Sequence, residues 1–174
     1  MARNCGAFVL LGTILIVLYN RDGMKTLTDK RYTLIEHTAD LAYVAYGKDV
    51  EELFENAAYA LFDVYTDLSR VKESIERPIC IQIETDRTKT DIDYEQLLVR
   101  WLNELLYLNE VEDLLFKRFK VKGFSTGELR ASAYGEKFSS GRHVILTPLK
   151  AVTYHRIEVV KGPNRWHARV IVDL

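Results

Sequence analysis

Cysteine is scarce in this chain. Cys5 and Cys80 are the only two among 174 residues, and neither belongs to a C-x-x-C pair. The sequence therefore carries no zinc-ribbon or thioredoxin-like motif, and such sparse use of cysteine suits a reducing cytosol. Cys80 stands in the apolar run "PICIQIE", which predicts a buried thiol that packs as a small hydrophobic side chain.

A large net charge is also absent. The 24 lysines and arginines are balanced by 25 aspartates and glutamates, for a formal net charge of −1. This balance argues against a protein that coats nucleic acid through net charge alone, and leaves room only for a local basic patch. No stretch is of low complexity, and the length fits one domain with a substantial core.

The common catalytic signatures are missing as well. The chain contains no G-x-x-x-x-G-K-[ST], G-x-G-x-x-G, H-E-x-x-H or G-x-S-x-G motif. It therefore has no sequence motif typical of a phosphate-cradling loop, a zinc protease or a serine hydrolase.

One long apolar run, "AFVLLGTILIVLY", occupies residues 7–19. It is shorter than the about 20 residues that span a membrane, and no small-x-small cleavage pattern follows it. Because Met24 precedes a well-formed domain, the favoured interpretation is that residues 1–23 are an apolar extension outside the fold, upstream of the true start. A membrane anchor or signal, or an ordinary apolar strand or helix, are the alternatives. The domain is then expected over residues 24–174.

Two segments show helical periodicity, roughly residues 50–66 and 93–109. Asp49 and Glu52 form a capping-box-like pair before the first. The apolar residues of each recur at helical spacing, which predicts that one face of each helix packs on a core: Leu53, Phe54, Ala57, Leu61 and Val64 in the first, and Leu97, Leu98, Trp101, Leu102, Leu105 and Leu106 in the second.

The other segments read as strands. Their order with the helices is β-β-α-β-α-β-β-β-β, so strands are grouped at the end rather than alternating with helices. This predicts a single α+β domain with a mostly antiparallel sheet and two amphipathic helices. The strands are "RYTLIEH", "LAYVAYG", "RPICIQIET", "LLFKRFKVKGF", "ELRASAYGEKF", "KAVTYHRIEVVKG" and "RWHARVIVDL". We expect the third to be entered through Pro78.

Polar residues stand at the ends of these strands. Asp40 ends the polar knot "EHTAD", and Asp173 closes the apolar run "VIV" beside the last residue, Leu174. An aspartate that closes an apolar strand is costly to desolvate unless it is paired or bound to a cation. Together these carboxyl groups would suit Ca²⁺ or Mg²⁺; a nearby His37 or His155 would admit Zn²⁺ or Mn²⁺. The plainer alternatives are a turn-capping aspartate and a solvated one.

Two further patterns have competing interpretations. His155 as a base, with Lys150 steadying an oxyanion, would fit a metal-dependent phosphoesterase or nuclease; a hydrogen-bonded strand histidine and a solvated lysine are the simpler alternatives. The basic run "LLFKRFKVKGF" could bind RNA, but an edge strand with a charged outer face is favoured.

The blocks "EHTADLAYVAYGKDVEELFENAAYALFDV", "KAVTYHRIEV" and "HARVIVDL" resemble the archease family, from about Tyr32 to Leu174. The resemblance implies a small cytoplasmic helper protein rather than an enzyme. Such proteins activate the RtcB-type RNA ligase, which joins tRNA halves in tRNA splicing with GTP and a divalent metal. They promote guanylylation and multiple turnover of the ligase. A general protein chaperone is a further alternative.

The resemblance also implies a site. It assigns the metal to Asp40, Asp173 and Leu174, and places His37, Lys150 and His155 in the same cluster. Calcium is the metal most expected, with magnesium, manganese or zinc as alternatives. The expected partners are the ligase and, through it, tRNA halves, with no stable membrane partner.

Overall fold

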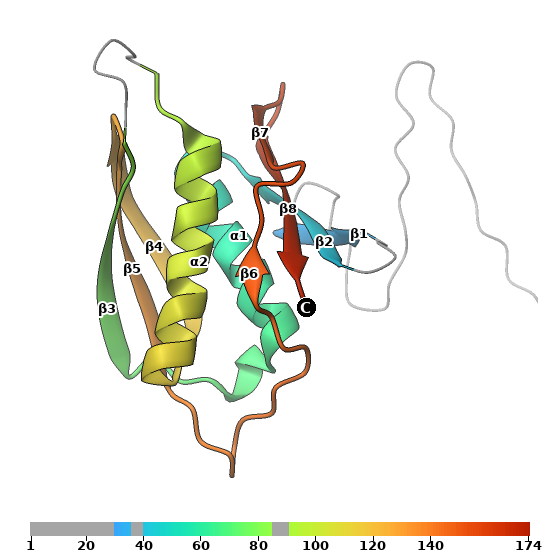
Figure 1. The fold of residues 1–174 in the computed structure, drawn as a ribbon, viewed down its shortest axis with the longest axis vertical. Helices are drawn as coiled ribbons and strands as arrows, with labels where there is room; N and C mark the ends of the chain where they lie inside the picture. The colour runs from blue at the N-terminus through green and yellow to red at the C-terminus, as the bar shows by residue number, and fades with distance from the viewer. Residues whose placement is uncertain (1–29, 36–39, 85–90) are drawn as a thin grey trace, which may run out of the picture. The chain divides into compact units, whose positions relative to one another are not determined.

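The structure is a computed structural model that describes residues 30–35, 40–84 and 91–174. The expected extension over residues 1–23 and the candidate residue His37 lie outside these ranges. A compact unit runs from Arg31 to Leu174 (Figure 1). Its elements are β1 (Tyr32–Ile35), β2 (Leu41–Gly47), α1 (Val50–Tyr65), a 3₁₀ turn (Leu68–Arg70), β3 (Ile75–Gln82), α2 (Tyr94–Glu112), β4 (Leu114–Ser125), β5 (Glu128–Lys137), β6 (Ala151–Val152), β7 (Glu158–Lys161) and β8 (Trp166–Asp173).

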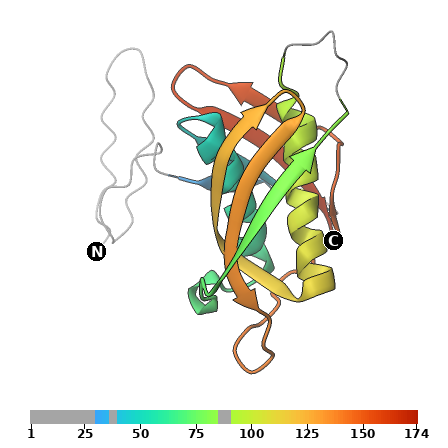
Figure 2. The ribbon, with the colours of Figure 1, turned by 90° about the vertical axis from the view of Figure 1, so that its left-hand side faces the viewer.

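The strands form two antiparallel sheets with both helices between them. One sheet has the order β1-β2-β8-β6, with β7 also paired to β8, and the other has the order β3-β5-β4. Helix α1 packs against β2 and β8 on one side and β4 on the other, while α2 reaches β6 and the three-stranded sheet. Figure 1 shows these layers edge-on, and Figure 2 shows the three-stranded sheet in front of the helices. The α+β class is confirmed; the strands divide into two sheets rather than one.

Helix α1 begins as its sequence predicted. The Asp49 carboxylate accepts a hydrogen bond from the N–H of Glu52 at 2.8 Å, and the Glu52 carboxylate accepts one from the N–H of Lys48 at 2.7 Å. These bonds satisfy donors that a helix start leaves open. The helix is buried on more than one face, because Ala57, Ala58 and other small residues let the sheets approach on both sides.

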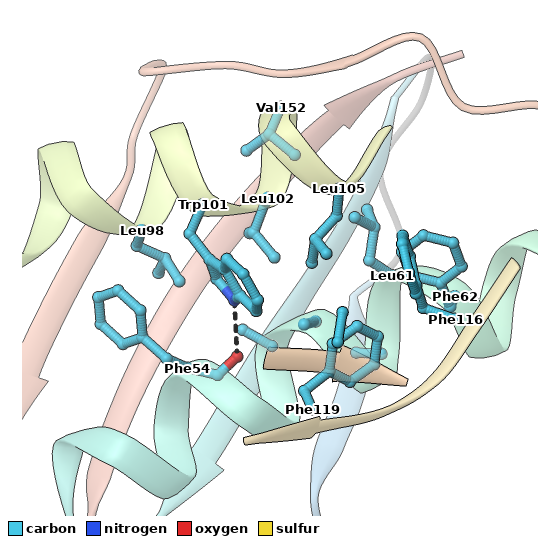
Figure 3. Packing of buried hydrophobic residues seen from close by; sticks show 14 of the residues in the cluster. Phe54, Leu61, Phe62, Leu98, Trp101, Leu102, Leu105, Phe116, Phe119 and Val152 are labelled. Atoms are coloured by element: carbon cyan, nitrogen blue, oxygen red, sulfur yellow. Dashed lines mark hydrogen bonds between the residues drawn. The ribbon is translucent and has the colours of Figure 1, made fainter. Parts of the chain in front are cut away.

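Helix α2 supplies several large side chains to the core, among them Trp101, Leu102 and Leu105. Asp93 caps its start by accepting from the N–H of Gln96 at 2.9 Å, and Asp113 ends it in a left-handed conformation with φ of 54°. Trp101 is fully buried and donates its indole N–H to the carbonyl of Phe54 on α1 at 3.3 Å (Figure 3). None of the helices in the described part of the chain is long and apolar enough to cross a membrane.

Three strand predictions need correction or refinement. Cys80 is exposed, not buried: β3 has one face toward the helices, and Ile79 and Ile81 take that face while Cys80 points outward. Strand β3 begins at Ile75, and Pro78 lies inside it, which the edge position of β3 permits because no neighbour needs the missing N–H.

The segment expected as a single strand over "KAVTYHRIEVVKG" is two short strands, β6 and β7. A turn separates them, and within it Arg156 has a positive φ of 52°. Both strands pair with β8 along the same edge, one at each end. The break lets this edge change direction beside the middle of β8.

Strand β4 lies at the edge of its sheet, as the favoured interpretation of the basic run required. Arg118 pairs with Glu73, Lys120 with Glu55, and Lys122 with Glu76. These charges face carboxylates of the same domain, so the run is a neutralised edge rather than a free basic surface.

Candidate functional site

The pairing of β2 with β8 brings Asp40 level with Asp173. The register joins Leu41 to Val172 at the end of the two strands. One step further along an antiparallel pair places Asp40 opposite Asp173, and residues opposite each other lie about 5 Å apart. Asp40 is half-buried and Asp173 is exposed. The polar knot before β2 therefore presents a carboxylate at the same sheet end as the last residues of β8.

Strand β6 adds Lys150 to this end of the sheet. The register joins Ala151 to Asp173, and the N–H of Lys150 donates to the carbonyl of Asp173 at 2.9 Å. The Lys150 ammonium donates to the main-chain oxygen of Leu174. Three strands thus collect Asp40, Asp173, Leu174 and Lys150 at one corner, which we call the sheet-end cluster.

Asn103 on α2 holds β6 in place. Its amide N–H donates to the carbonyl of Val152 at 2.8 Å, and its amide oxygen accepts from the N–H of Val152 at 2.9 Å. The two-residue strand β6 thus pairs with β8 on one edge and with a side chain on the other. The sequence alone does not single out Asn103, because it lies outside the apolar stripe of the helix, where a polar side chain is expected to be solvated.

The structure separates His155 from the sheet-end cluster. The N–H of Thr153 donates to the carbonyl of Ile171 at 3.1 Å, so the chain has already moved two positions along β8 from Asp173. His155 follows, exposed, in the turn before β7. Two residues of β8 span about 7 Å, and His155 lies beyond that point, in the turn between β6 and β7.

The donors at the sheet-end cluster are hard oxygens: two carboxylates and one main-chain oxygen. Ca²⁺ and Mg²⁺ prefer such ligands, and Zn²⁺ prefers nitrogen and sulfur. Among the described residues, no group of three His, Cys, Asp or Glu side chains is placed to hold a metal. A cation here would therefore need main-chain oxygens or water in addition to Asp40 and Asp173. The Lys150 ammonium already bonds the Leu174 oxygen and would compete with a cation for it.

The domain matches one protein family over almost its whole length. The model of the archease protein family matches residues 32–174. Protein archease of Methanosarcina mazei is 42% identical over 149 residues, a match that covers 83% of this chain and 97% of that protein.

Two solved structures share the fold. The solution structure of protein 1598 of Methanobacterium thermoautotrophicum matches with a TM-score of 0.69 and 38% identity, over 83% of this chain and 99% of that one. A crystal structure from Thermotoga maritima, described as an archease and possible chaperone, matches with a TM-score of 0.52 and 24% identity, over 80% of this chain and 94% of that one. At that identity the second match shows a likeness of fold alone.

Proposed function

Because the chain belongs to the archease family, we propose that it is a non-catalytic activator of an RtcB-type RNA ligase in tRNA splicing. It acts in the cytoplasm, promotes guanylylation of the ligase, and lets the ligase turn over repeatedly. It holds a divalent cation, Ca²⁺ or Mg²⁺, at the sheet-end cluster. The observation that carries the proposal is the strand register that brings Asp40 level with Asp173.

The position of the cluster supports contact with a partner. Asp173 and Leu174 are exposed at the end of β8, and Lys150 is exposed beside them. A carboxylate pair on a rigid sheet end can enter the active site of another protein without unfolding its own domain. Once bound, the cation would neutralise the two carboxylates, and Lys150 would offer a positive charge to nucleotide phosphate.

A metal-dependent phosphoesterase or nuclease is less well supported. That function requires His155 to act as a base beside Lys150 and the metal. The register instead sets His155 beside the middle of β8, away from Asp173. A catalytic base has to lie within hydrogen-bond reach of the proton that it removes, so the geometry favours the activator.

Substitution of the two carboxylates tests the metal. Asp40→Asn and Asp173→Asn keep the side-chain size but remove the negative charge, and we expect each to lower the affinity for Ca²⁺ or Mg²⁺ at least tenfold in calorimetric titration, which is about 1.4 kcal/mol. Asp91→Asn is the matched control, since Asp91 is exposed and lies on a different part of the chain. Equal cation affinity in all four proteins would remove the metal from the proposal.

An aggregation assay, run beside a ligation assay, separates the activator from a general chaperone. Suppression of the aggregation of unrelated denatured proteins, unaffected by Asp173→Asn, would favour the chaperone. Stimulation of the ligase that is lost with Asp173→Asn, without any such suppression, would favour the activator.

A further inference from the structure

A pocket of about 470 Å³ adjoins the sheet-end cluster. It lies between the end of α1, the end of α2 and the connection over residues 138–150, and Lys150 forms part of its wall. A connection this long without regular structure is uncommon in a compact domain and is usually functional. We call this site the α2 pocket.

The walls of the α2 pocket are fixed by hydrogen bonds. The N–H of Phe138 donates to the carbonyl of Asp113 at 2.7 Å, and the N–H of Leu146 donates to the carbonyl of Tyr65 at 2.8 Å. The hydroxyl of Thr66 donates to the carbonyl of Val144 at 2.8 Å. The connection is thus tied to both helices, and the pocket exists before any ligand arrives.

A buried charged cluster around Glu136, on β5, anchors the start of the same connection. The Glu136 carboxylate contacts the His143 ring at 3.2 Å, accepts from the N–H of Lys72 at 2.6 Å, and forms an ion pair with Arg142. The N–H of Ser139 donates to Nδ1 of His143 at 3.0 Å, and Nε2 on the other side of the ring lies 3.2 Å from both the Glu136 carboxylate and Nε of Arg142. These contacts hold residues 139–143 while the pocket wall continues beyond them.

The lining of the α2 pocket combines acidic, aromatic and apolar groups with one amide, Asn109, and one lysine, Lys150. Glu110 and Asp113 are exposed at its mouth, and neither forms an ion pair with any described residue. Tyr65 and Phe138 supply aromatic rings, and the remaining apolar lining comes from Leu106, Ile145 and Leu149.

The two carboxylates act on the interior of the pocket. Burial raises the pKa of Tyr65; a hydrogen bond with Asn109 opposes this, and the negative charges of Asp113 and Glu110 raise the pKa further. The hydroxyl of Tyr65 therefore stays neutral at physiological pH. Lys150 also lines the pocket, but its ammonium is bonded to the oxygen of Leu174, and two carboxylates against one ammonium leave the lining net negative. The field in the pocket therefore favours a cation and disfavours a phosphate or carboxylate.

Exposed apolar side chains that neighbour the lining residues in the chain indicate which kind of molecule carries the positively charged group. Phe138, Val144 and Leu146 are exposed apolar side chains on the connection, and Tyr107 and Val111 are exposed on α2, one residue after Leu106 and Glu110, which line the pocket. Aromatic and aliphatic side chains around a charged pocket are typical of a protein interface. An RNA backbone would meet two unpaired carboxylates and is repelled.

We propose that the α2 pocket receives an arginine side chain of a protein partner, with its guanidinium between Tyr65 and Phe138 and paired with Glu110 and Asp113. Guanidinium is planar, stacks on aromatic rings and pairs with carboxylates through two parallel hydrogen bonds. The proposal rests on the proposed function in one respect: the partner is the ligase, and Lys150 links the pocket to the sheet-end cluster, so that one protein covers both.

The first test requires no ligase. N-acetyl-arginine methylamide is titrated into the full chain, and chemical shifts are followed by NMR; the norleucine analogue is the neutral control. We expect saturable shifts confined to the α2 pocket, with dissociation constants in the millimolar range for a single side chain (~−4 kcal/mol corresponds to 1 mM). The Glu110→Gln/Asp113→Asn double variant should lose them, and Glu84→Gln/Asp91→Asn should keep them. Equal shifts from the norleucine analogue, or from the double variant, would overturn the proposal.

The second test measures binding to the ligase. The Glu110→Gln/Asp113→Asn variant should bind an RtcB-type ligase at least tenfold more weakly than the wild type. As the salt concentration is raised, the affinity of the wild type should fall more steeply than that of the variant. If that variant binds as tightly as the wild type while Asp173→Asn abolishes stimulation, the pocket proposal fails and the proposed function stands. If the arginine analogue binds but the ligase is neither bound nor stimulated by the wild type, the arginine pocket stands and the ligase is not its partner.

Discussion

Asn103 pairs with both main-chain groups of Val152, donating to its carbonyl at 2.8 Å and accepting from its N–H at 2.9 Å. A side chain on α2 thereby acts as a second neighbour for the two-residue strand β6. This relationship ties the helix layer to Lys150, which directly precedes β6 and bonds the oxygen of Leu174.

Asn103→Leu should therefore destabilise the protein and loosen the sheet-end cluster. The change leaves the N–H and carbonyl of Val152 without partners, which costs about 1–3 kcal/mol. Urea unfolding measures the loss. Asn56→Leu is a matched control, because Asn56 makes one such bond, to the carbonyl of Tyr46 at 2.7 Å. If the two variants lose the same free energy of unfolding, the double pairing with Val152 adds nothing.

Glu136→Gln should change how stability depends on pH. Burial acts to raise the pKa of Glu136, but the N–H of Lys72, the His143 ring and Arg142 outweigh it and hold the pKa below its ordinary value. A depressed carboxyl pKa stabilises the fold above the unfolded pKa of about 4.3, and this stabilisation is lost as pH falls through the folded pKa.

The free energy of unfolding of the wild type should therefore fall below about pH 4.3. Glu136→Gln should have a lower free energy of unfolding at pH 7, and that free energy should fall less steeply in acid. Urea unfolding over a pH series checks this, with Glu84→Gln, an exposed carboxylate, as the control. If the free energy of unfolding falls as steeply below about pH 4.3 in Glu136→Gln as in the wild type, the contacts of Glu136 with Lys72, His143 and Arg142 do not have this role.

Gly135 and Gly141 should respond oppositely to alanine. A Cβ at Gly135 would lie 1.8 Å from the main-chain oxygen of Leu115, whereas a Cβ at Gly141 meets nothing within 4 Å. Gly135→Ala has to push apart the paired strands β4 and β5, so we expect a loss of about 1–3 kcal/mol or more. Gly141→Ala should be neutral or slightly stabilising, since it restricts the unfolded chain. Thermal unfolding distinguishes them, and equal melting temperatures would refute the close approach.

Lys150→Met should separate cation binding from activation. Lys150 is exposed, so stability should change by no more than about 0.5 kcal/mol. Cation affinity at Asp40 and Asp173 should rise, because a competing positive charge is removed, while ligase stimulation falls. Lys161→Met, an exposed lysine on β7, should alter neither. Weaker cation binding in Lys150→Met would mean that Lys150 supports the metal rather than opposing it.

The sequence predicted the two helices well for a physical reason. Helical spacing and the Asp49 cap are local signals, and they are confirmed in α1. Asp40 directly precedes the apolar strand β2, and Asp173 closes the apolar strand β8; the pairing of these two strands sets the two aspartates level with each other. The metal itself stays a prediction.

Other features depend on contacts that no local pattern contains. The exposure of Cys80 follows from which face of β3 meets the helices. The break between β6 and β7 arises because both short strands pair with the same edge of β8, one at each end. His155 lies in the turn between them rather than beside Asp173. Asn103 and the α2 pocket join residues more than 30 positions apart, so they emerge only once the helices and the connection over residues 138–150 are packed together.

The most direct test of the account is a ligation assay with tRNA halves, GTP, Mn²⁺ or Mg²⁺ and an RtcB-type ligase at substoichiometric concentration, with and without the full chain. The account predicts multiple turnovers of ligase only when the wild-type chain is present, and a single turnover or fewer with Asp173→Asn, whose fold is verified by circular dichroism. Ligation that is unchanged by the wild-type chain, or stimulated equally by Asp173→Asn, would contradict it.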